Sequence, residues 1–424
     1  MANLLDYLDW RGDLTMAQAP FNEVDNLILA ELSYVDFRGI LPPPGQGRPV
    51  PLETAAQAFF SRYPEGEKID LGVLIPDQIP EMLERMAASR RFGGMKLGCF
   101  LDQVDAAQGE QFAALAAETG DGAVYLSFRG TDDTLAGWRE DLEMACMPEV
   151  PAQKKALAYI ETAARQYPRR KLRLGGHSKG GNLAVYSAMK CAPFVRKRIQ
   201  KIYSLDGPGF RPEVLKECHY NAIEDKVVKL LPHSSMIGMI FERDIHYRVV
   251  ESKNHGLLQH DPFSWLVKDD HFVDVGDIYE SQKIMNEALN EWILSLNEEQ
   301  VRTFVDTLYQ VISASQADDL ITFTADWKKS MNAVVTALKE VDDQTAEMLR
   351  GIIRSLFEIA RCKVKEELTA TKKTRHRFKN TKRAGKAEEV RPDPAASPDA
   401  TVTQGSAARH APKLRGSHRQ GRPG

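Results

Sequence analysis

The pattern of apolar and polar positions along the chain predicts alternating strands and helices. Short stretches rich in β-branched, aromatic or other apolar residues mark the expected strands, at 96–101, 111–117, 123–128, 170–175, 201–205, 226–231 and 246–252. Apolar residues spaced three and four apart mark helices, at 3–8, 21–32 and 152–166 and over much of 52–91. Strands that alternate with helices favour a mostly parallel central sheet with helices on both faces, so the expected fold class is α/β.

The pattern becomes helical throughout from 279 to about 368, and beyond 371 it contains almost no large apolar residue. A segment of that composition cannot bury enough apolar surface to offset the entropy of ordering it. We therefore expect three parts: an α/β domain over 1–280, a helical extension over 281–369 and a basic disordered tail over 370–424.

Residues 170–192 predict a strand, a glycine-rich turn and a helix in close succession. The turn reads Gly-His-Ser-Lys-Gly at 176–180, and its glycines allow a bend in which a Cβ would collide with neighbouring backbone. This is the layout of a nucleophile elbow, with Ser178 at its apex and its hydroxyl exposed at the start of a helix. An ordinary glycine-rich turn between a strand and a helix is the alternative.

A serine nucleophile needs donors for the oxyanion that develops on its substrate. The backbone N–H of Lys179 lies in the first helical turn, where no intrahelical carbonyl is available to it. Thr131 follows the carboxyl end of a predicted strand and could give the second N–H, unless the segment around it is only a turn. Arg129 is expected to be structural and to pair with a carboxylate such as Asp141.

The acid and base partners of the serine are expected after it in the chain, each in the loop that follows a strand. Asp206 comes directly after the strand that follows the elbow helix, although it could simply cap the turn before Gly-Pro-Gly. Asp225, Asp244 and Glu242 are weaker rivals for the acid.

The base is predicted in the loop after the last strand. That loop contains His260 and His255, and we favour His260 over His255. A loop histidine without a catalytic role is the alternative for either residue.

The chain has 424 residues, 43% of them hydrophobic and 27% charged, which is typical of a globular protein with a sizeable core. The formal net charge is −3, but residues 361–424 carry 17 Lys and Arg against 6 Asp and Glu. This tail could contact an anionic membrane surface weakly, although a solvated tail is the simpler interpretation. No specific nucleic-acid partner is expected.

Five scattered cysteines without a C-x-x-C pair favour reduced thiols, and the sequence predicts neither a metal nor a cofactor. Acidic residues occupy the start of the chain, where a signal peptide would need a basic segment. No stretch approaches the ~18 consecutive apolar residues of a membrane span. We expect a soluble cytoplasmic protein.

Three motifs of the chain resemble those of the class 3 lipases: Phe-Arg-Gly-Thr at 128–131, Trp138 with Asp141, and Gly-His-Ser-Lys-Gly-Gly-Asn at 176–182. Asp-Gly-Pro-Gly-Phe at 206–210 and Gln-His-Asp at 259–261, with Trp265, are more similar to a bacterial group of lipase-like α/β-hydrolases that carry a domain of unknown function. The resemblance covers about residues 1–280. It implies an α/β-hydrolase fold in which Ser178 is the nucleophile and the N–H groups of Thr131 and Lys179 form the oxyanion hole.

Two positions depart from the class 3 pattern. Class 3 lipases usually take their acid from the loop after the next strand, but that loop, 231–236, offers no carboxylate here, so the acid role shifts to Asp206. Lys179 replaces the usual apolar residue after the serine. Its cation could hold an anionic head group, or it could be solvated at the helix start.

The sequence therefore predicts a serine ester hydrolase whose substrate is an acyl ester or lipid. The acyl chain would lie in a cleft covered by the amino-terminal helices or by the apolar run 236–241, unless that run is simply buried. The alternative function is that of a catalytically inactive hydrolase scaffold that acts as a binding or interaction protein.

Overall fold

The computed structural model describes residues 2–63, 69, 75–105, 110–131, 140, 143–144, 147, 149–217, 219–242, 246–279, 282–283, 286, 290, 293–294 and 347. The chain divides into two compact units, residues 1–350 and residues 351–424, and every described residue belongs to the first. The predicted basic tail and most of the predicted helical extension lie outside the described residues.

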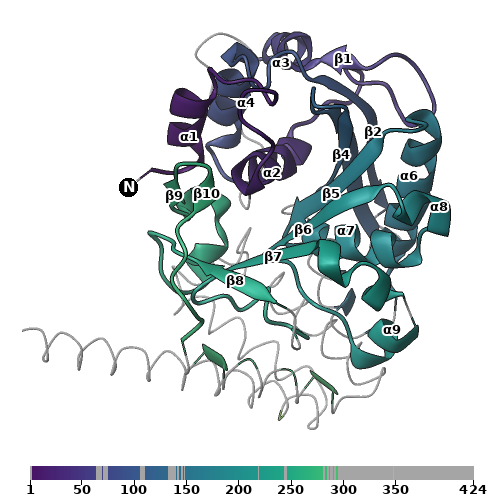
Figure 1. Cartoon of the computed structure of the whole chain (residues 1–424), viewed down its shortest axis with the longest axis vertical. Coiled ribbons are helices and arrows are strands. Elements are labelled where there is room, and N and C mark those ends of the chain that lie inside the picture. Colours follow the sequence, from purple (N-terminus) through teal and green to yellow (C-terminus); the bar gives the residue numbers. More distant parts are fainter. Residues whose placement is uncertain are drawn as a thin grey trace, which may run out of the picture. The chain divides into compact units, whose positions relative to one another are not determined.

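Eight strands form one sheet, in which each strand neighbours the next along the chain (Figure 1). Strands β1 to β4 pair antiparallel, and β4 to β8 pair parallel. The strands are β1 (Val50–Pro51), β2 (Lys96–Asp105), β3 (Glu110–Glu118), β4 (Ala123–Phe128), β5 (Lys171–His177), β6 (Ile199–Leu205), β7 (Val227–Pro232) and β8 (Tyr247–Val250). A small separate ribbon pairs β9 (Val267–Lys268) with β10 (His271–Phe272).

Helices cover both faces of this sheet. The α-helices are α1 (Leu4–Arg11), α2 (Glu23–Glu31), α3 (Leu52–Phe60), α4 (Ile79–Ala88), α6 (Pro151–Gln166), α7 (Lys179–Lys190), α8 (Pro193–Arg196) and α9 (Pro212–Glu217). The short 3₁₀ helices are η1 (Leu32–Tyr34), η2 (Tyr220–Ala222), η3 (Glu224–Lys226), η4 (Gly256–His260) and η5 (Pro262–Ser264). The first four α-helices pack into one apolar core and α6 and α7 into a second, with the sheet between them (Figure 1).

The two cores explain why the inner strands read as continuous apolar runs. All six residues of β4 are buried, because a sheet covered on both faces buries both sets of side chains. This layered arrangement, with a strand, tight turn and helix at its centre, is the α/β-hydrolase fold, and the predicted fold class is confirmed.

A buried ion pair holds α2 to the segment that follows α4. The guanidinium of Arg91 donates from Nε to Asp25 Oδ1 at 2.6 Å, and both side chains are inaccessible to solvent. The Tyr7 hydroxyl donates to the same carboxylate at 2.9 Å, and further Arg91 donors reach the carbonyls of Leu14 and Ala19. The two amino-terminal helices are thereby fixed against the rest of the domain.

We expect Arg91→Met to lower the free energy of unfolding by about 3 to 5 kcal/mol, because it leaves the Asp25 carboxylate buried without its cation. Urea denaturation followed by circular dichroism measures the change. The matched control is Arg85→Met, which breaks partly exposed pairs with Asp9 and Glu81 and should cost less than about 1 kcal/mol. Equal losses in the two variants would contradict the structural role given to the buried pair.

Candidate active site

Ser178 occupies the sharp turn between β5 and α7. Its backbone has φ 57° and ψ −132°, a conformation that L-residues rarely adopt. The flanking glycines are required by close packing, because a Cβ on Gly180 would lie 2.0 Å from the carbonyl oxygen of Phe128, and one on Gly176 would lie 2.4 Å from the same atom. The predicted elbow geometry is present, and Ser178 is 8% exposed.

Asp206 lies beside Ser178 because both follow neighbouring parallel strands. The Ser178 N–H donates to the carbonyl of Leu205 at 2.9 Å, and the Asp206 N–H donates to the carbonyl of Leu230 at 2.9 Å. Asp206 also has a positive φ, 48°, and its side chain is buried. The carboxyl ends of β5 and β6 therefore bring the two predicted residues to one edge of the sheet.

His260, in η4, completes the contact that the sequence predicts. Its Nδ1 lies 2.6 Å from Oδ2 of Asp206, and 31% of its side chain is exposed to solvent. The loop is held in place by the Trp265 indole, which donates to the carbonyl of Gln259 at 2.8 Å. His255, the other candidate base, is exposed at the N-cap of the same turn, and it is His260 that meets the aspartate.

Two partners determine the charge state of Asp206. Burial acts to raise the pKa of this carboxyl, but the hydrogen bond and positive potential of His260 outweigh it, and the pKa falls below its ordinary value. A hydrogen bond from the Ser235 hydroxyl to Oδ1 lowers the pKa further. Asp206 is thus held as a carboxylate with both oxygens satisfied.

Ser235 was not predicted as a site residue. It lies in the loop after β7, where class 3 lipases usually carry their acid, and here a hydroxyl from that loop contacts Asp206, the candidate acid, instead. The only signal in the sequence was the position of a polar side chain directly after a strand adjacent to that of Asp206.

The loop that carries Ser235 is itself anchored by residues from the predicted helical extension. The Asn286 side chain donates to the Ser235 carbonyl at 3.3 Å, and Asn290 both donates to the Met239 carbonyl and accepts from the Phe241 N–H. Met239 and Phe241 are buried. Gly238 is buried as well, and the other three residues of the run 236–241 are half-buried, so the run is packed against the domain over part of its length.

The structure contradicts both expectations for the Lys179 side chain, that it holds a head group or that it is solvated. Its Nζ is buried and donates to Glu140 Oε2 at 2.9 Å and to the backbone and side-chain oxygens of Gln111 at 3.2 Å. It is neither solvated at the helix start nor directed at a head group. Glu140 also accepts the backbone N–H of Ala152 at 2.9 Å, so the pair joins the elbow to the start of α6. The Lys179 backbone N–H remains the first of α7.

The segment after β4 lies against the serine. A Cβ on Gly130 would lie 3.3 Å from Cβ of Ser178, and the partly buried Thr131 follows directly. Arg129 is structural, as expected, and pairs with Asp102 of β2 at 3.0 Å. Its expected partner Asp141 lies outside the described residues, as does Trp138.

The rival acids have other positions. Glu242 pairs with the buried Lys229, Asp225 lies in η3, and Asp244 is outside the described residues.

Across the part of the chain that the structure describes, no helix is long and apolar enough to cross a membrane.

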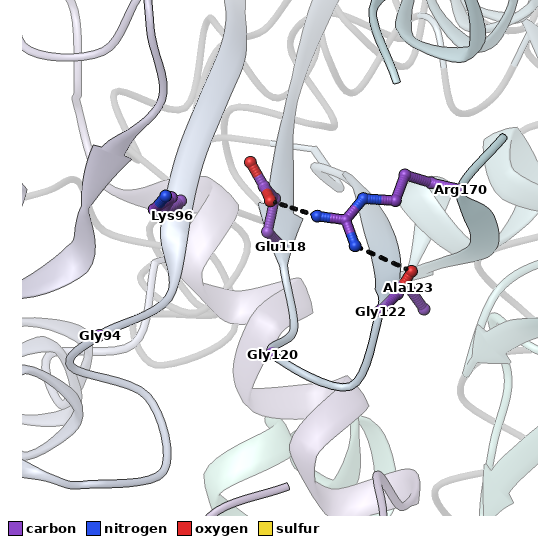
Figure 2. A pocket seen from close by; sticks show the side chains of 7 residues that line it. All are labelled: Gly94, Lys96, Glu118, Gly120, Gly122, Ala123 and Arg170. Carbon is purple, nitrogen blue, oxygen red and sulfur yellow. Dashed lines mark hydrogen bonds and ion pairs between the residues drawn. The ribbon is translucent and has the colours of Figure 1, made fainter. Parts of the chain in front are cut away.

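A small pocket lies at the opposite end of the sheet from Ser178 (Figure 2). Glu118, at the end of β3, and Arg170, just before β5, form an ion pair at 2.9 Å across it, and Arg170 also reaches the carbonyl of Gly122. Because β5 runs from this pocket to the elbow, the pocket is separated from the serine by the full length of a strand.

Comparisons with solved structures find fungal proteins. A mutant form of MDLA from Penicillium cyclopium is 14% identical, with 61% of this chain and 87% of that chain covered, at a TM-score of 0.34. A nonglycosylated Yarrowia lipolytica lipase is 11% identical, with 53% and 76% covered, at a TM-score of 0.29. The native lipase–propeptide complex of Rhizomucor miehei is 14% identical, at a TM-score of 0.29, and the match covers 37% of this chain but only 57% of that one. At these TM-scores the likeness carries no argument about the site.

No curated protein is similar enough to this chain to be matched with it. A family model does match, over residues 86–310, which contain β2 to β8 and all of the residues described above as candidates for the serine's partners. The match spans more than half of the sequence, and the chain belongs to the Mbeg1-like family, a lipase-like group.

Proposed function

We propose that this lipase-like protein is a serine ester hydrolase in which Ser178, His260 and Asp206 act together. The observation that supports this most is the 2.6 Å contact between Nδ1 of His260 and Oδ2 of Asp206. Because the carboxylate accepts the proton on Nδ1, a neutral His260 keeps Nε2 free to accept one. Because 31% of the His260 side chain is exposed to solvent, a substrate can approach the ring.

The proposed reaction forms and hydrolyses an acyl-enzyme. Ser178 Oγ bonds to the ester carbonyl carbon while His260 Nε2 takes its proton, and the carbonyl oxygen becomes an oxyanion. The ester C–O bond then breaks, and the proton on Nε2 goes to the leaving alcohol. Water repeats the sequence and releases the acid. The N–H groups of Thr131 and Lys179 are proposed to stabilise the oxyanion, and the position of Lys179 at the start of α7 supports this.

The substrate that we propose is an acyl ester, either a lipid or a small ester. The weak contact of the basic tail with an anionic membrane and the cytoplasmic location stay predictions, and the tail lies outside the described residues. The alternative function, an inactive scaffold that binds a partner, is an outcome of the following test.

We expect a fluorophosphonate probe to label the wild type with one molecule per chain and to leave Ser178→Ala unlabelled, because the probe traps an activated serine. His260→Ala and Asp206→Asn should slow labelling by about 100-fold or more. Intact-mass spectrometry measures the labelling, and a series of p-nitrophenyl esters of graded chain length then measures the acyl preference. A wild type that stays unlabelled at every pH would instead favour the scaffold.

Replacement of Ser235 by Ala should slow labelling about tenfold, since the Asp206 carboxylate loses one hydrogen bond that helps hold it against His260. Ser234→Ala is the matched control, because Ser234 contributes its backbone N–H to Gln259 and the substitution keeps that bond. Labelling rates of the two variants are compared at one pH by quenched time courses. If both variants label at the wild-type rate, Ser235 has no part in orienting the acid.

The Lys179→Met variant separates the backbone of this residue from its side chain. We expect a loss of about 3 kcal/mol or more in the free energy of unfolding, because Glu140 is left buried without its cation. The labelling rate of the folded protein should change by less than about threefold, because the proposed oxyanion donor is the N–H.

The double variant Lys179→Met with Glu140→Gln should regain part of the lost stability, as the unpaired carboxylate is gone. Urea denaturation and labelling of the same preparations measure both quantities. A folded Lys179→Met protein that labels 100-fold more slowly would show that the cation itself acts on the reacting centre.

A further inference from the structure

A second pair of titratable side chains lies against His260. The ring of His177, the residue before the elbow serine, packs on the His260 ring with 4.5 Å between centroids and 35° between planes. Nδ1 of His177 lies 3.5 Å from Oε1 of Glu31, the last residue of α2. The Trp265 ring meets His177 edge-on at 6.3 Å. His177 is therefore held between Glu31, Trp265 and His260.

Both members of the pair are buried and poorly satisfied. Among the residues that the structure describes, no hydrogen-bond partner is found for either carboxyl oxygen of Glu31 or for Nε2 of His177. Buried polar groups that lack partners are rare because they are costly, and where they persist they are expected to have a function. The proposed reaction of Ser178 leaves both side chains unused.

The surroundings favour neutral forms of both groups. Burial, and then the nearby Asp261 carboxylate, raise the pKa of Glu31 well above its ordinary value. Burial, and then the proximity of His260, lower the pKa of His177 to about 3, although Asp206 acts in the opposite direction. Both shifts in pKa favour the neutral form of the group concerned.

The two neutral groups are able to form a hydrogen bond with each other. A neutral imidazole carries one N–H and one acceptor nitrogen, and a protonated carboxyl can donate through its O–H or accept through its carbonyl oxygen. Nδ1 of His177 faces Glu31, so this nitrogen is the one that can pair with the carboxyl. The 3.5 Å separation exceeds a hydrogen bond by only a few tenths of an ångström, which a small rotation of the Glu31 side chain closes.

We propose that Glu31 and His177 are positioning residues for His260: the neutral carboxyl of Glu31 pairs with Nδ1 of the neutral His177 ring, and the His177 ring supports the ring of His260. This inference rests on the proposed function, because support of His260 affects a rate only if His260 acts on Ser178. A neutral support also places no cation beside His260 when it takes up a proton from the serine, whereas a charged His177 at this distance would oppose that step.

The titratable groups near the pair come from several elements. Asp206 follows β6 and faces both histidines, Asp261 precedes η5 and faces Glu31, and Lys253 faces Asp261. Lys229 of β7 faces Asp206, and Tyr125 of β4 faces Glu31. None of these groups changes in the variants that follow, so a difference between variants reports on Glu31.

The test compares Glu31→Gln with Glu31→Leu by the rate of fluorophosphonate labelling across a pH series. Glutamine keeps a neutral hydrogen-bonding group beside His177, so we expect a rate within about twofold of the wild type and an unchanged midpoint of the pH profile. Leucine removes the hydrogen-bonding group, and we expect labelling about tenfold slower, the factor that loss of one buried hydrogen bond implies. Glu23→Gln, the same substitution at the other end of α2 where the carboxylate pairs with Arg248, is the control and should behave as the wild type.

A Gln variant as slow as the Leu variant overturns the proposal, because the effect would then depend on the carboxylate charge or on packing rather than on a neutral hydrogen-bonding group. A midpoint that moves to lower pH in the Gln variant also overturns it, because this would mean that an ionised Glu31 stabilises the His260 cation. Wild-type rates in the Leu variant overturn it as well.

Stability as a function of pH tests the pair without any activity. The pKa of Glu31 is higher in the folded protein than in the unfolded chain, so this group stabilises the fold at acid pH. The stabilisation is lost as the pH rises from the unfolded pKa to the folded pKa. Relative to Glu31→Gln, the unfolding equilibrium constant of the wild type should therefore rise with pH, by up to about tenfold per pH unit, once the pH exceeds the unfolded value of about 4.3. Parallel pH dependences of the two proteins would show that Glu31 ionises in the folded state and would refute the pair. If this signature is present but Ser178 is not labelled, the proposed function fails and the pair stands.

Discussion

The close approach of β4, β5 and α7 at one point is the constraint on which the rest of the site depends. A Cβ on Gly180 would lie 2.0 Å from the carbonyl oxygen of Phe128, so only glycine allows the chain to turn from strand to helix so sharply. The turn forces Ser178 into a left-handed conformation and holds its hydroxyl beyond the carboxyl end of β5. The strain is sustained because the strand and the helix on either side are buried in the core.

The parallel sheet then assembles groups from distant parts of the chain around that turn. Asp206, Ser235 and His260 follow three successive strands, and their loops meet because parallel strands end at the same edge. Glu31 comes from the amino-terminal helices, which the Arg91–Asp25 pair fixes to the domain. The stability of that helical layer and the chemistry proposed for the edge are therefore linked through α2, whose last residue faces His177.

Position relative to strands is the reason that much of the site could be predicted. Ser178, Asp206 and His260 each follow a segment with a clear strand pattern, and topology alone brings such residues together. The same reasoning failed for side chains whose direction depends on packing. Lys179 is adjacent to the serine, yet its side chain turns inward to Glu140, and Ser235 and Glu31 carry no local pattern that distinguishes them from other polar residues.

By itself, the sequence determined the fold class, the order of the elements and the elbow, because hydrophobic periodicity and glycine spacing are local properties that the backbone must obey. Only the tertiary structure decided which histidine meets Asp206, where the Lys179 charge is neutralised and what lies against His177. Those outcomes depend on contacts between residues tens to hundreds of positions apart, whose side-chain directions are set by the packing of helices on the sheet. No local sequence pattern indicates these contacts.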